Sequence, residues 1–271
     1  MKIIRVFPRR TNATPIDEMA FVGMPSMFAE ADEVHISVTF SWDLPEAERL
    51  EKEWQGIAPV KIGGPATGQR GEEFIPGLYL KDGYTITSRG CPNKCWFCLV
   101  PKREGPLREL PIRDGWNILD DNLLACSDSH ILEVMSMVKR QTKRPHFTGG
   151  LEAARLKLWH VQELLKVKPK ELFFANDGPE DREPLFEAGK LLLTNGFNRP
   201  SNTLRAYVLI GYPKDTIDAA EHRMYETMQA GFLPMAMLYR DQTGERSSIW
   251  RRFAWQWSRP AIYSKIYGSI V

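Results

Sequence analysis

The 271-residue chain lacks a long apolar run and a marked excess of charge of one sign. Its 36 lysine and arginine residues nearly balance its 34 aspartate and glutamate residues, which leaves a net charge of +2. No global field therefore favours nucleic acid, and any such contact would need a local basic patch. The apolar segments are short and broken by charges, so we expect no membrane-spanning segment. The first ten residues also lack the apolar core and cleavage site of a secretory signal.

Cysteine is scarce as well, and its distribution is uneven. The chain has four cysteines, and three of them lie within eight positions as Cys91, Cys95 and Cys98, with Phe97 directly before the last. Disulfide frameworks are typical of small secreted chains, whereas a cysteine cluster in an intracellular chain of this size usually binds metal. We therefore expect a reducing, cytoplasmic environment and a metal centre on this C-x3-C-x2-C loop.

Residues 1–80 have the pattern of a small α/β appendage. Short β-branched runs alternate with one helix candidate that has Asp43 as its start signal, and a glycine-rich segment then leads toward the cysteines. We expect strands at 3–7, 34–40 and 59–62, a helix at 46–55 and a linker at 63–77.

Residues 81–240 repeat one pattern six times, in which a short apolar run is followed by a loop and then, in most units, by an amphipathic segment. Six such units predict an α/β fold with a parallel sheet and crossover helices, which is a partial (β/α)6 TIM-like barrel. In such barrels the functional loops follow the strands. The expected strands are 84–88, 116–119, 146–148, 171–175, 205–210 and 234–239, and the expected helices are one starting at Ser127 or Asp128 and those at 152–167, 184–195 and 216–230.

Residues 241–271 form a tail that combines tryptophan with basic residues. One interpretation is an amphipathic helix that covers the flank of the barrel. The other is a surface that meets a polymeric substrate through phosphate contacts or stacking. The residues concerned are Trp250, Trp255, Trp257, Arg246, Arg251, Arg252, Arg259 and Lys265.

Two kinds of metal centre fit three thiolates on one loop. Zinc usually takes a fourth protein ligand, and the candidates near this loop in sequence are Cys126 and His130. An iron–sulfur cube normally takes four cysteines, so three would leave one iron open, as a catalytic centre requires. Cys126 can also be read as a buried thiol without a metal.

The loop resembles the hallmark of the radical S-adenosylmethionine superfamily, a C-x3-C-x-aromatic-C motif after the first strand of a partial (β/α)6 barrel. Cys91, Cys95, Phe97 and Cys98 match it position by position, and the resemblance covers about residues 80–240. It implies that each cysteine ligates one iron of a [4Fe–4S] cluster, while S-adenosylmethionine chelates the fourth. An electron would then cleave the sulfonium and give a 5′-deoxyadenosyl radical that abstracts hydrogen from a substrate.

The resemblance also implies contacts with S-adenosylmethionine at four places. Asp120 or Asp121 would hold the methionine amino group in a loop that lacks the family's glycines. Asn176 and Asp177 would bind the ribose hydroxyls, and Ile210 with Gly211 would form the adenine platform, with Phe97 nearby. Other interpretations stay open, since Asp120 or Asp121 can cap the next helix and the segment 176–178 is an ordinary turn sequence.

The segment 207–216 is similar to the cobalamin-associated and methylthiotransferase-like branch of this superfamily. The appendage is shorter than a full cobalamin domain, and no D-x-H-x2-G loop is present, so cobalamin binding is doubtful. The extra N-terminal cysteines of the methylthiotransferases are absent too.

Two functions therefore remain in view. The first is a single-cluster radical enzyme that takes electrons from a flavodoxin- or ferredoxin-like reductant and acts on an unidentified substrate, either nucleic acid or a small molecule, away from membranes. The second is a non-enzymatic zinc-binding or nucleic-acid-binding module that uses the same cysteines. The sequence assigns no residue to the attack on the substrate.

Overall fold

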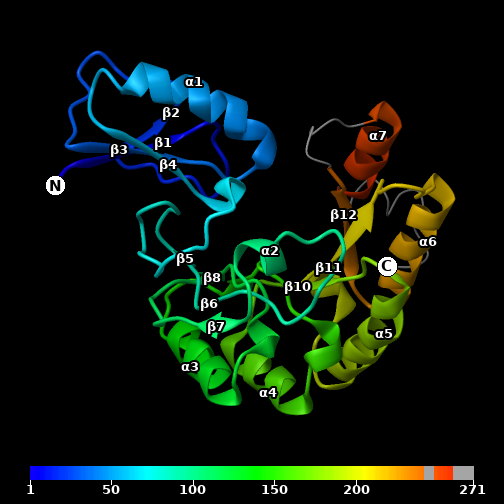
Figure 1. Ribbon diagram of the computed structural model, residues 1–271. Coiled ribbons are helices and arrows are strands. Elements are labelled where there is room, and N and C mark those ends of the chain that lie inside the picture. Colours follow the sequence, from blue (N-terminus) through cyan, green and yellow to red (C-terminus); the bar gives the residue numbers. More distant parts are fainter. Residues whose placement is uncertain (241–246, 259–271) are drawn as a thin grey trace. The chain divides into compact units, whose positions relative to one another are not determined.

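The computed structural model describes residues 1–240 and 247–258 and divides into two compact units, Met1–Gly115 and Trp116–Val271 (Figure 1). The predicted domains 1–80, 81–240 and 241–271 stay predictions. Of the tail, Arg246, Arg259 and Lys265 lie outside the described residues. Within the described ranges, no helix has the length and apolar character needed to cross a membrane.

The N-terminal unit is built on a four-stranded parallel sheet in the order β2-β1-β3-β4. Figure 1 shows α1 lying along one face of this sheet as the crossover between β3 and β4. The strand predicted at 3–7 is confirmed, whereas β2 was missed because three residues carry no periodic signal. The elements are β1 (Ile3–Phe7), β2 (Ala20–Val22), β3 (Glu33–Ser37), η1 (Ser41–Asp43), α1 (Leu44–Trp54), β4 (Val60–Gly63) and η2 (Pro65–Thr67).

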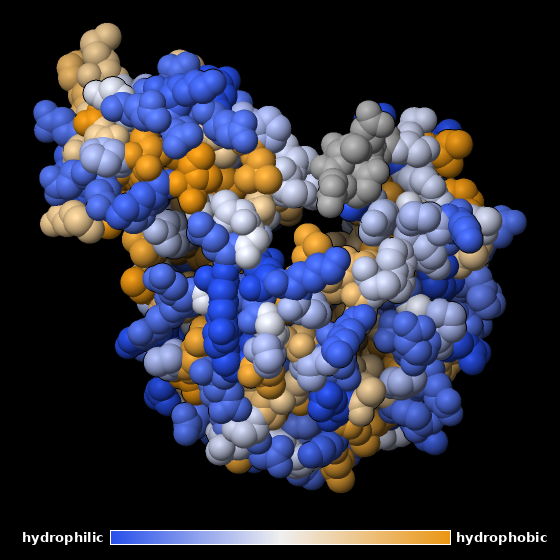
Figure 2. Space-filling model, viewed as in Figure 1, coloured by the Kyte–Doolittle hydropathy of each residue, from blue (hydrophilic) through white to orange (hydrophobic). Residues whose placement is uncertain are grey.

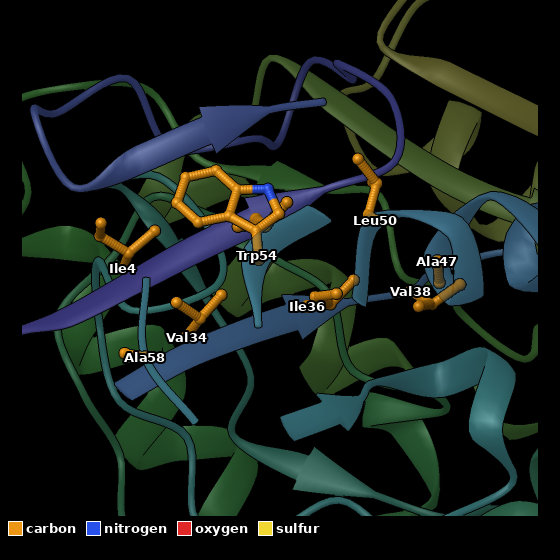
Figure 3. Close-up of a cluster of buried hydrophobic side chains, with 9 residues drawn as sticks. Ile4, Val34, Ile36, Val38, Ala47, Leu50, Trp54 and Ala58 are labelled. Atoms are coloured by element: carbon orange, nitrogen blue, oxygen red, sulfur yellow. The ribbon is translucent and has the colours of Figure 1, made fainter. Parts of the chain in front are cut away.

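Trp54 is at the centre of the hydrophobic core of this sheet. Its side chain is fully buried, its ring lies 5.2 Å from that of Phe21, and its indole N–H donates to the carbonyl oxygen of Gly23 at 3.0 Å. Figure 3 shows the indole among the aliphatic side chains of β1, β3 and α1. A buried tryptophan needs such a hydrogen-bond partner, so this contact fixes the end of α1 against the β2–β3 connection.

The exposed surface of the N-terminal unit has several hydrophobic side chains. Figure 2 shows hydrophobic groups among the hydrophilic ones over this unit. The largest exposures are in the connection between β2 and β3, where Met27 is 90% exposed and Phe28 is 87% exposed.

The predicted strand 84–88 is wrong in one respect, because the chain forms two short strands there. β5 (Tyr84–Thr85) is followed by β6 (Ser88–Arg89), and β6 pairs antiparallel with β7 (Arg108–Glu109). The segment between β6 and β7, which includes α2 (Val100–Arg103), is thus an excursion whose two ends meet in a strand pair.

The C-terminal unit contains five parallel strands that pair in sequence order from β8 to β12. Helices α3 to α6 connect successive strands and lie on the outer side of the sheet (Figure 1). Among the described residues the sheet is not closed, since β12 pairs with β11 alone. The strands are β8 (Asn117–Ile118), β9 (His146–Phe147), β10 (Glu171–Ala175), β11 (Leu204–Ile210) and β12 (Leu233–Leu238), and the helices are η3 (Leu123–Ala125), α3 (Asp128–Lys139), η4 (Ala153–Arg155), α4 (Leu158–Val167), α5 (Pro179–Thr194), η5 (Arg199–Ser201), α6 (Ile217–Gln229) and α7 (Ser248–Trp257).

Two helix starts differ from the prediction. The helix expected at 152–167 begins at Leu158, because residues 153–155 form η4 and the His160 ring accepts the backbone N–H of Lys157 at 2.9 Å. The helix expected at 184–195 begins earlier, at Pro179, because the carboxylate of Asp181 accepts the N–H groups of Asp177 and Gly178. Side-chain caps thus decided both boundaries.

Helix α7 has the amphipathic character predicted for the tail. Phe253 and Trp257 are buried against β11, β12 and α6, while Trp255 is 49% exposed. One side of α7 therefore covers β11 and β12, as expected for an amphipathic helix on the flank of the sheet.

The approach of α5 to the end of α6 leads to a first prediction. A Cβ on Gly189 would overlap the carbonyl oxygen of Ala230, so Gly189→Ala forces the two helices apart. We expect the free energy of unfolding to fall by at least about 2 kcal/mol in denaturant titrations. Gly56→Ala is the control, because no atom lies within 4 Å of its Cβ position, and it should change stability by less than about 0.5 kcal/mol. Equal effects of both substitutions would contradict the close approach.

Candidate metal and cofactor site

The three clustered thiols lie on the excursion between β6 and α2. Cys91 and Cys98 are half-buried, Cys95 is exposed, and none of the four cysteines, all of which the structure describes, is in a disulfide. The N–H of Cys98 donates to the carbonyl oxygen of Cys95 at 3.1 Å, which folds the second half of the motif into a turn. The structure therefore presents three reduced thiols from one short loop.

Gly90 sets the closure of this loop. Its φ of +84° lies in the left-handed region, and a Cβ there would overlap the carbonyl oxygen of Pro106 at the other end of the excursion. A side chain at this position would push apart the two ends that β6 and β7 hold together. The glycine before Cys91 is thus required by the backbone rather than by a ligand.

Glu104 ties the base of the cysteine loop together. Its side chain is 1% exposed, and its carboxylate meets Arg103 and Arg108 at 2.9 Å and Arg89 at 3.5 Å. It also accepts the N–H of Gly71 at 3.1 Å, while Arg108 donates to the carbonyl oxygen of Glu104 at 2.9 Å. The carboxylate thus links the strand before the thiols, the helix after them and an earlier segment of the chain.

The protonation of Glu104 follows from these contacts. Burial, the largest single effect, raises the pKa of the carboxyl, but the hydrogen bonds from Arg103 and Arg108 and the charge of Arg89 together lower the pKa below 4.5. The group is therefore ionised at neutral pH. Sequence reasoning missed Glu104, because only the fold brings the three arginines to it.

The loop after β8 carries two adjacent acids with different surroundings. Asp120 is 1% exposed, whereas Asp121 is half-buried. A Cβ on Gly149 would overlap the backbone of Asp120, so the end of β9 packs directly on this loop. Neither acid caps α3, because Ser127 is its N-cap and accepts the N–H of His130 at 3.3 Å.

Asp120 belongs to a buried cluster that sequence reasoning did not assemble. The ligand atoms of Asp120, Cys126 and His130 all lie within 4.8 Å of one another, and all three residues are buried. The sequence had pointed to Cys126 and His130 only as candidates to complete a centre on the cysteine loop.

The loop after β10 contains the two residues predicted to contact ribose. Asn176 is 2% exposed, and its amide nitrogen donates to Thr227 at 2.9 Å and to the carbonyl oxygen of Arg223 at 3.3 Å, so this side chain is turned toward α6. Asp177 is more accessible, and its carboxylate accepts the N–H of Leu209 at 2.9 Å. Burial, opposed by this hydrogen bond, raises the pKa of Asp177 to about 7.

The loop after β11 contains the predicted adenine platform. The Ile210 side chain is fully buried in the core with α6 and α7, so contact with a ligand here would come from the backbone and from Gly211. Gly211 has a φ of +72°, and its N–H donates at 2.8 Å to Asp215, which is paired with Arg223 at 2.8 Å. This buried ion pair holds the turn in place.

The remaining predicted residue, Phe97, is half-buried, and its ring lies 5.5 Å from that of Trp96 in an edge-on arrangement. Within the C-terminal unit, the loops after β8, β10 and β11 lie at one edge of the sheet because parallel strands share their carboxyl ends. The structure therefore brings the predicted acids, amide and glycine of that unit to a common edge.

The Glu104 contacts give the second prediction. Glu104→Ala leaves three arginines without their shared carboxylate, and we expect the free energy of unfolding to fall by about 3–5 kcal/mol at pH 7 in denaturant titrations. Because the folded-state pKa is lowered, this stabilisation is complete above about pH 4.5 and is lost as the pH falls below that value.

The matched control is Glu46→Ala, which removes an exposed pair with Arg49 and should cost less than about 1 kcal/mol. A Glu104→Ala protein as stable as the control would show that the arginine cluster does not depend on this carboxylate.

The chain is similar to known proteins in structure and not in sequence. Neither a protein-family model nor a curated protein sequence matches the chain. Two solved structures of the radical S-adenosylmethionine methyltransferase TsrM from Kitasatospora setae are similar. The one with cobalamin and a [4Fe–4S] cluster bound has a TM-score of 0.61 at 11% identity, over 87% of this chain and 74% of that one. The one with tryptophan and a S-adenosylmethionine analogue bound has a TM-score of 0.60 at 12% identity, over 88% and 72%. The chain thus shares the fold of a radical S-adenosylmethionine methyltransferase.

Proposed function

We propose that this chain is a radical S-adenosylmethionine enzyme, with one [4Fe–4S] cluster on Cys91, Cys95 and Cys98. The observation that carries the proposal is that a loop matching the superfamily motif occurs in a chain that shares its fold with a radical S-adenosylmethionine methyltransferase. We also propose that the open parallel sheet of the C-terminal unit corresponds to the partial barrel of that superfamily.

The donor set of the loop fits such a cluster. Three reduced thiols from one turn can each ligate one iron, and the missing fourth thiol leaves one iron for a substrate group. When bound, the cluster would supply the electron that cleaves the sulfonium of S-adenosylmethionine to give the 5′-deoxyadenosyl radical. Gly90 and Glu104 would hold together the two ends of the excursion that carries the thiols.

Polar residues of the C-terminal unit would orient S-adenosylmethionine. Of the two adjacent acids, Asp121 is the better partner for the methionine amino group, because Asp120 is buried beside Cys126 and His130. Asp177 would accept ribose hydroxyls, and the turn at Gly211 would receive the adenine. The Asn176 side chain donates to Thr227, and this hydrogen bond would hold the loop that presents Asp177 to the ribose.

Cobalamin is not part of the proposal. The TsrM structure named above contains cobalamin. In this chain the parallel sheet of residues 1–115 has four strands and one accompanying helix longer than a single turn, which is less than the full cobalamin domain of that branch. The proposed activity needs an external one-electron reductant of the flavodoxin or ferredoxin type. Its substrate is left open between nucleic acid and a small molecule.

The third prediction concerns the cluster. After anaerobic reconstitution, we expect about four iron atoms per chain in the wild type and cleavage of S-adenosylmethionine upon reduction. Cys91→Ala, Cys95→Ala and Cys98→Ala should each lose most of the iron and all of the cleavage, while Cys126→Ala should keep the iron. A colourless wild-type protein with zinc on the three cysteines would contradict the proposal.

The fourth prediction uses the raised pKa of Asp177. Its carboxyl loses its proton near pH 7, and the ionised form accepts stronger hydrogen bonds from ribose hydroxyls. We therefore expect the affinity for S-adenosylmethionine to rise by up to about tenfold from pH 6 to pH 8, since linkage ties affinity to the ionised fraction.

Isothermal titration calorimetry on the reconstituted protein would measure this affinity. Asp177→Asn keeps an acceptor for the N–H of Leu209 and should bind with an affinity that no longer changes in this interval. If the wild type and this variant share one pH profile, Asp177 does not contact the ligand.

A further inference from the structure

The cluster of Asp120, Cys126 and His130 combines three different metal-binding groups in one buried place. A carboxylate oxygen, a thiol sulfur and an imidazole nitrogen lie within 4.8 Å of one another, and the three residues are 1%, 7% and 6% exposed. We propose that these residues bind a zinc ion, at a site separate from the cysteine loop and independent of the function proposed above.

Three structural features bring the donors together. Asp120 follows β8 by two residues, and the close packing of Gly149 fixes its backbone. Cys126 ends η3, and its N–H donates to the carbonyl oxygen of Leu123 at 3.1 Å. His130 lies in the first turn of α3, which Ser127 caps. All three donors therefore lie within the eleven-residue stretch 120–130, and local hydrogen bonds or packing hold the backbone at each of them.

The chemistry of the donors selects the metal. Magnesium and calcium prefer sites made of oxygen ligands, whereas zinc accepts thiolate, imidazole and carboxylate together. With one sulfur and two nitrogen or oxygen donors, zinc–ligand distances of about 2.0–2.3 Å in a tetrahedron place the donors about 3.3–3.5 Å apart. Binding therefore needs each pair of donors to approach by up to about 1.5 Å from separations that are at most 4.8 Å.

Burial supports the same assignment. A dication at this point would balance the charges of a buried carboxylate and a thiolate. With neutral imidazole as the third donor, the site as a whole would be close to neutral. The fourth position would be left to water or to a neighbouring group.

The site would tie the loop after β8 to the start of α3. Asp120 would be fixed as a ligand, and the backbone next to it would hold Asp121 at the carboxyl edge of the sheet. The zinc would therefore order the loop after β8, which lies at the predicted cofactor edge. It would also assign Cys126 a partner other than the iron–sulfur cluster.

The test is the zinc content and the zinc-edge X-ray absorption of the full-length protein, reconstituted anaerobically with its cluster. Because this absorption is specific to zinc, the iron does not obscure it. We expect about one zinc per chain, with one sulfur at about 2.3 Å and the remaining ligands nitrogen or oxygen at about 2.0–2.2 Å. Zinc that occupied the cysteine loop instead would show three sulfur neighbours and would overturn the assignment.

Substitutions distinguish the proposed zinc site from the proposed iron–sulfur cluster. Cys126→Ser, His130→Gln and Asp120→Asn should each lower the zinc content at least about tenfold and leave the iron content unchanged. Cys91→Ala should do the reverse. His222→Gln is the matched control, because His222 is exposed on α6 and paired with Glu226.

If a variant fails to fold, the wild-type measurements still decide. A wild type that contains iron but no zinc, and that takes up none at equimolar zinc, would show that the three residues form a hydrogen-bonded cluster only. Zinc retained in all three variants would overturn the proposal equally. Loss of the cluster in Cys91→Ala with zinc retained would support it even if cleavage of S-adenosylmethionine were never observed.

Discussion

Parallel strand pairing is the constraint on which the C-terminal unit depends. Each strand from β8 to β12 runs in the same direction as its neighbour, so every return crosses through a helix and every loop after a strand reaches the same edge. The strands themselves are short, with two residues in β8 and in β9, and they leave long connections. Those connections contain the acids, the amide and the glycine predicted to contact the cofactor, while the helices bury apolar side chains against the sheet. The predicted cofactor contacts of this unit therefore share one edge of the sheet because the strands are parallel.

Buried ion pairs then hold the loops in place, and both partners of each pair belong to the same unit. Glu104 holds three arginines at the base of the cysteine loop, and Asp215 with Arg223 holds the turn after β11. Removing one partner of such a group leaves an uncompensated charge, so these contacts determine loop geometry more strongly than surface pairs do. Asp177 differs, because burial raises its pKa while no arginine in the described part of the chain forms an ion pair with it at salt-bridge distance. Of these acids, the one without an ion-pair partner is also the one proposed to contact the ribose.

The sequence predicted the order of the elements well and their boundaries less well. The strands at 3–7 and 171–175 are confirmed because their β-branched and aromatic runs are continuous, whereas β2 and the split between β5 and β6 carry no such pattern. Helix starts shifted where a side chain intervened, as Asp181 did for α5. The cysteine spacing could be read directly. The contacts of Glu104 and the meeting of Asp120 with Cys126 and His130 could not, because residues up to 33 positions apart come together only in the folded chain.

The placement of the four cysteines affects whether one iron of the proposed iron–sulfur cluster would lack a protein ligand. A fourth thiolate within reach would complete the coordination of an iron–sulfur cube and leave no iron for a substrate group. Cys126 is the other thiol of the chain, and its sulfur lies with Asp120 and His130, within 4.8 Å of their ligand atoms. A thiol engaged there, whether by zinc or by its neighbours, would not be available as a fourth ligand of the proposed iron–sulfur cluster. On this proposal, three thiols would serve the open centre, while the fourth would be held by Asp120 and His130.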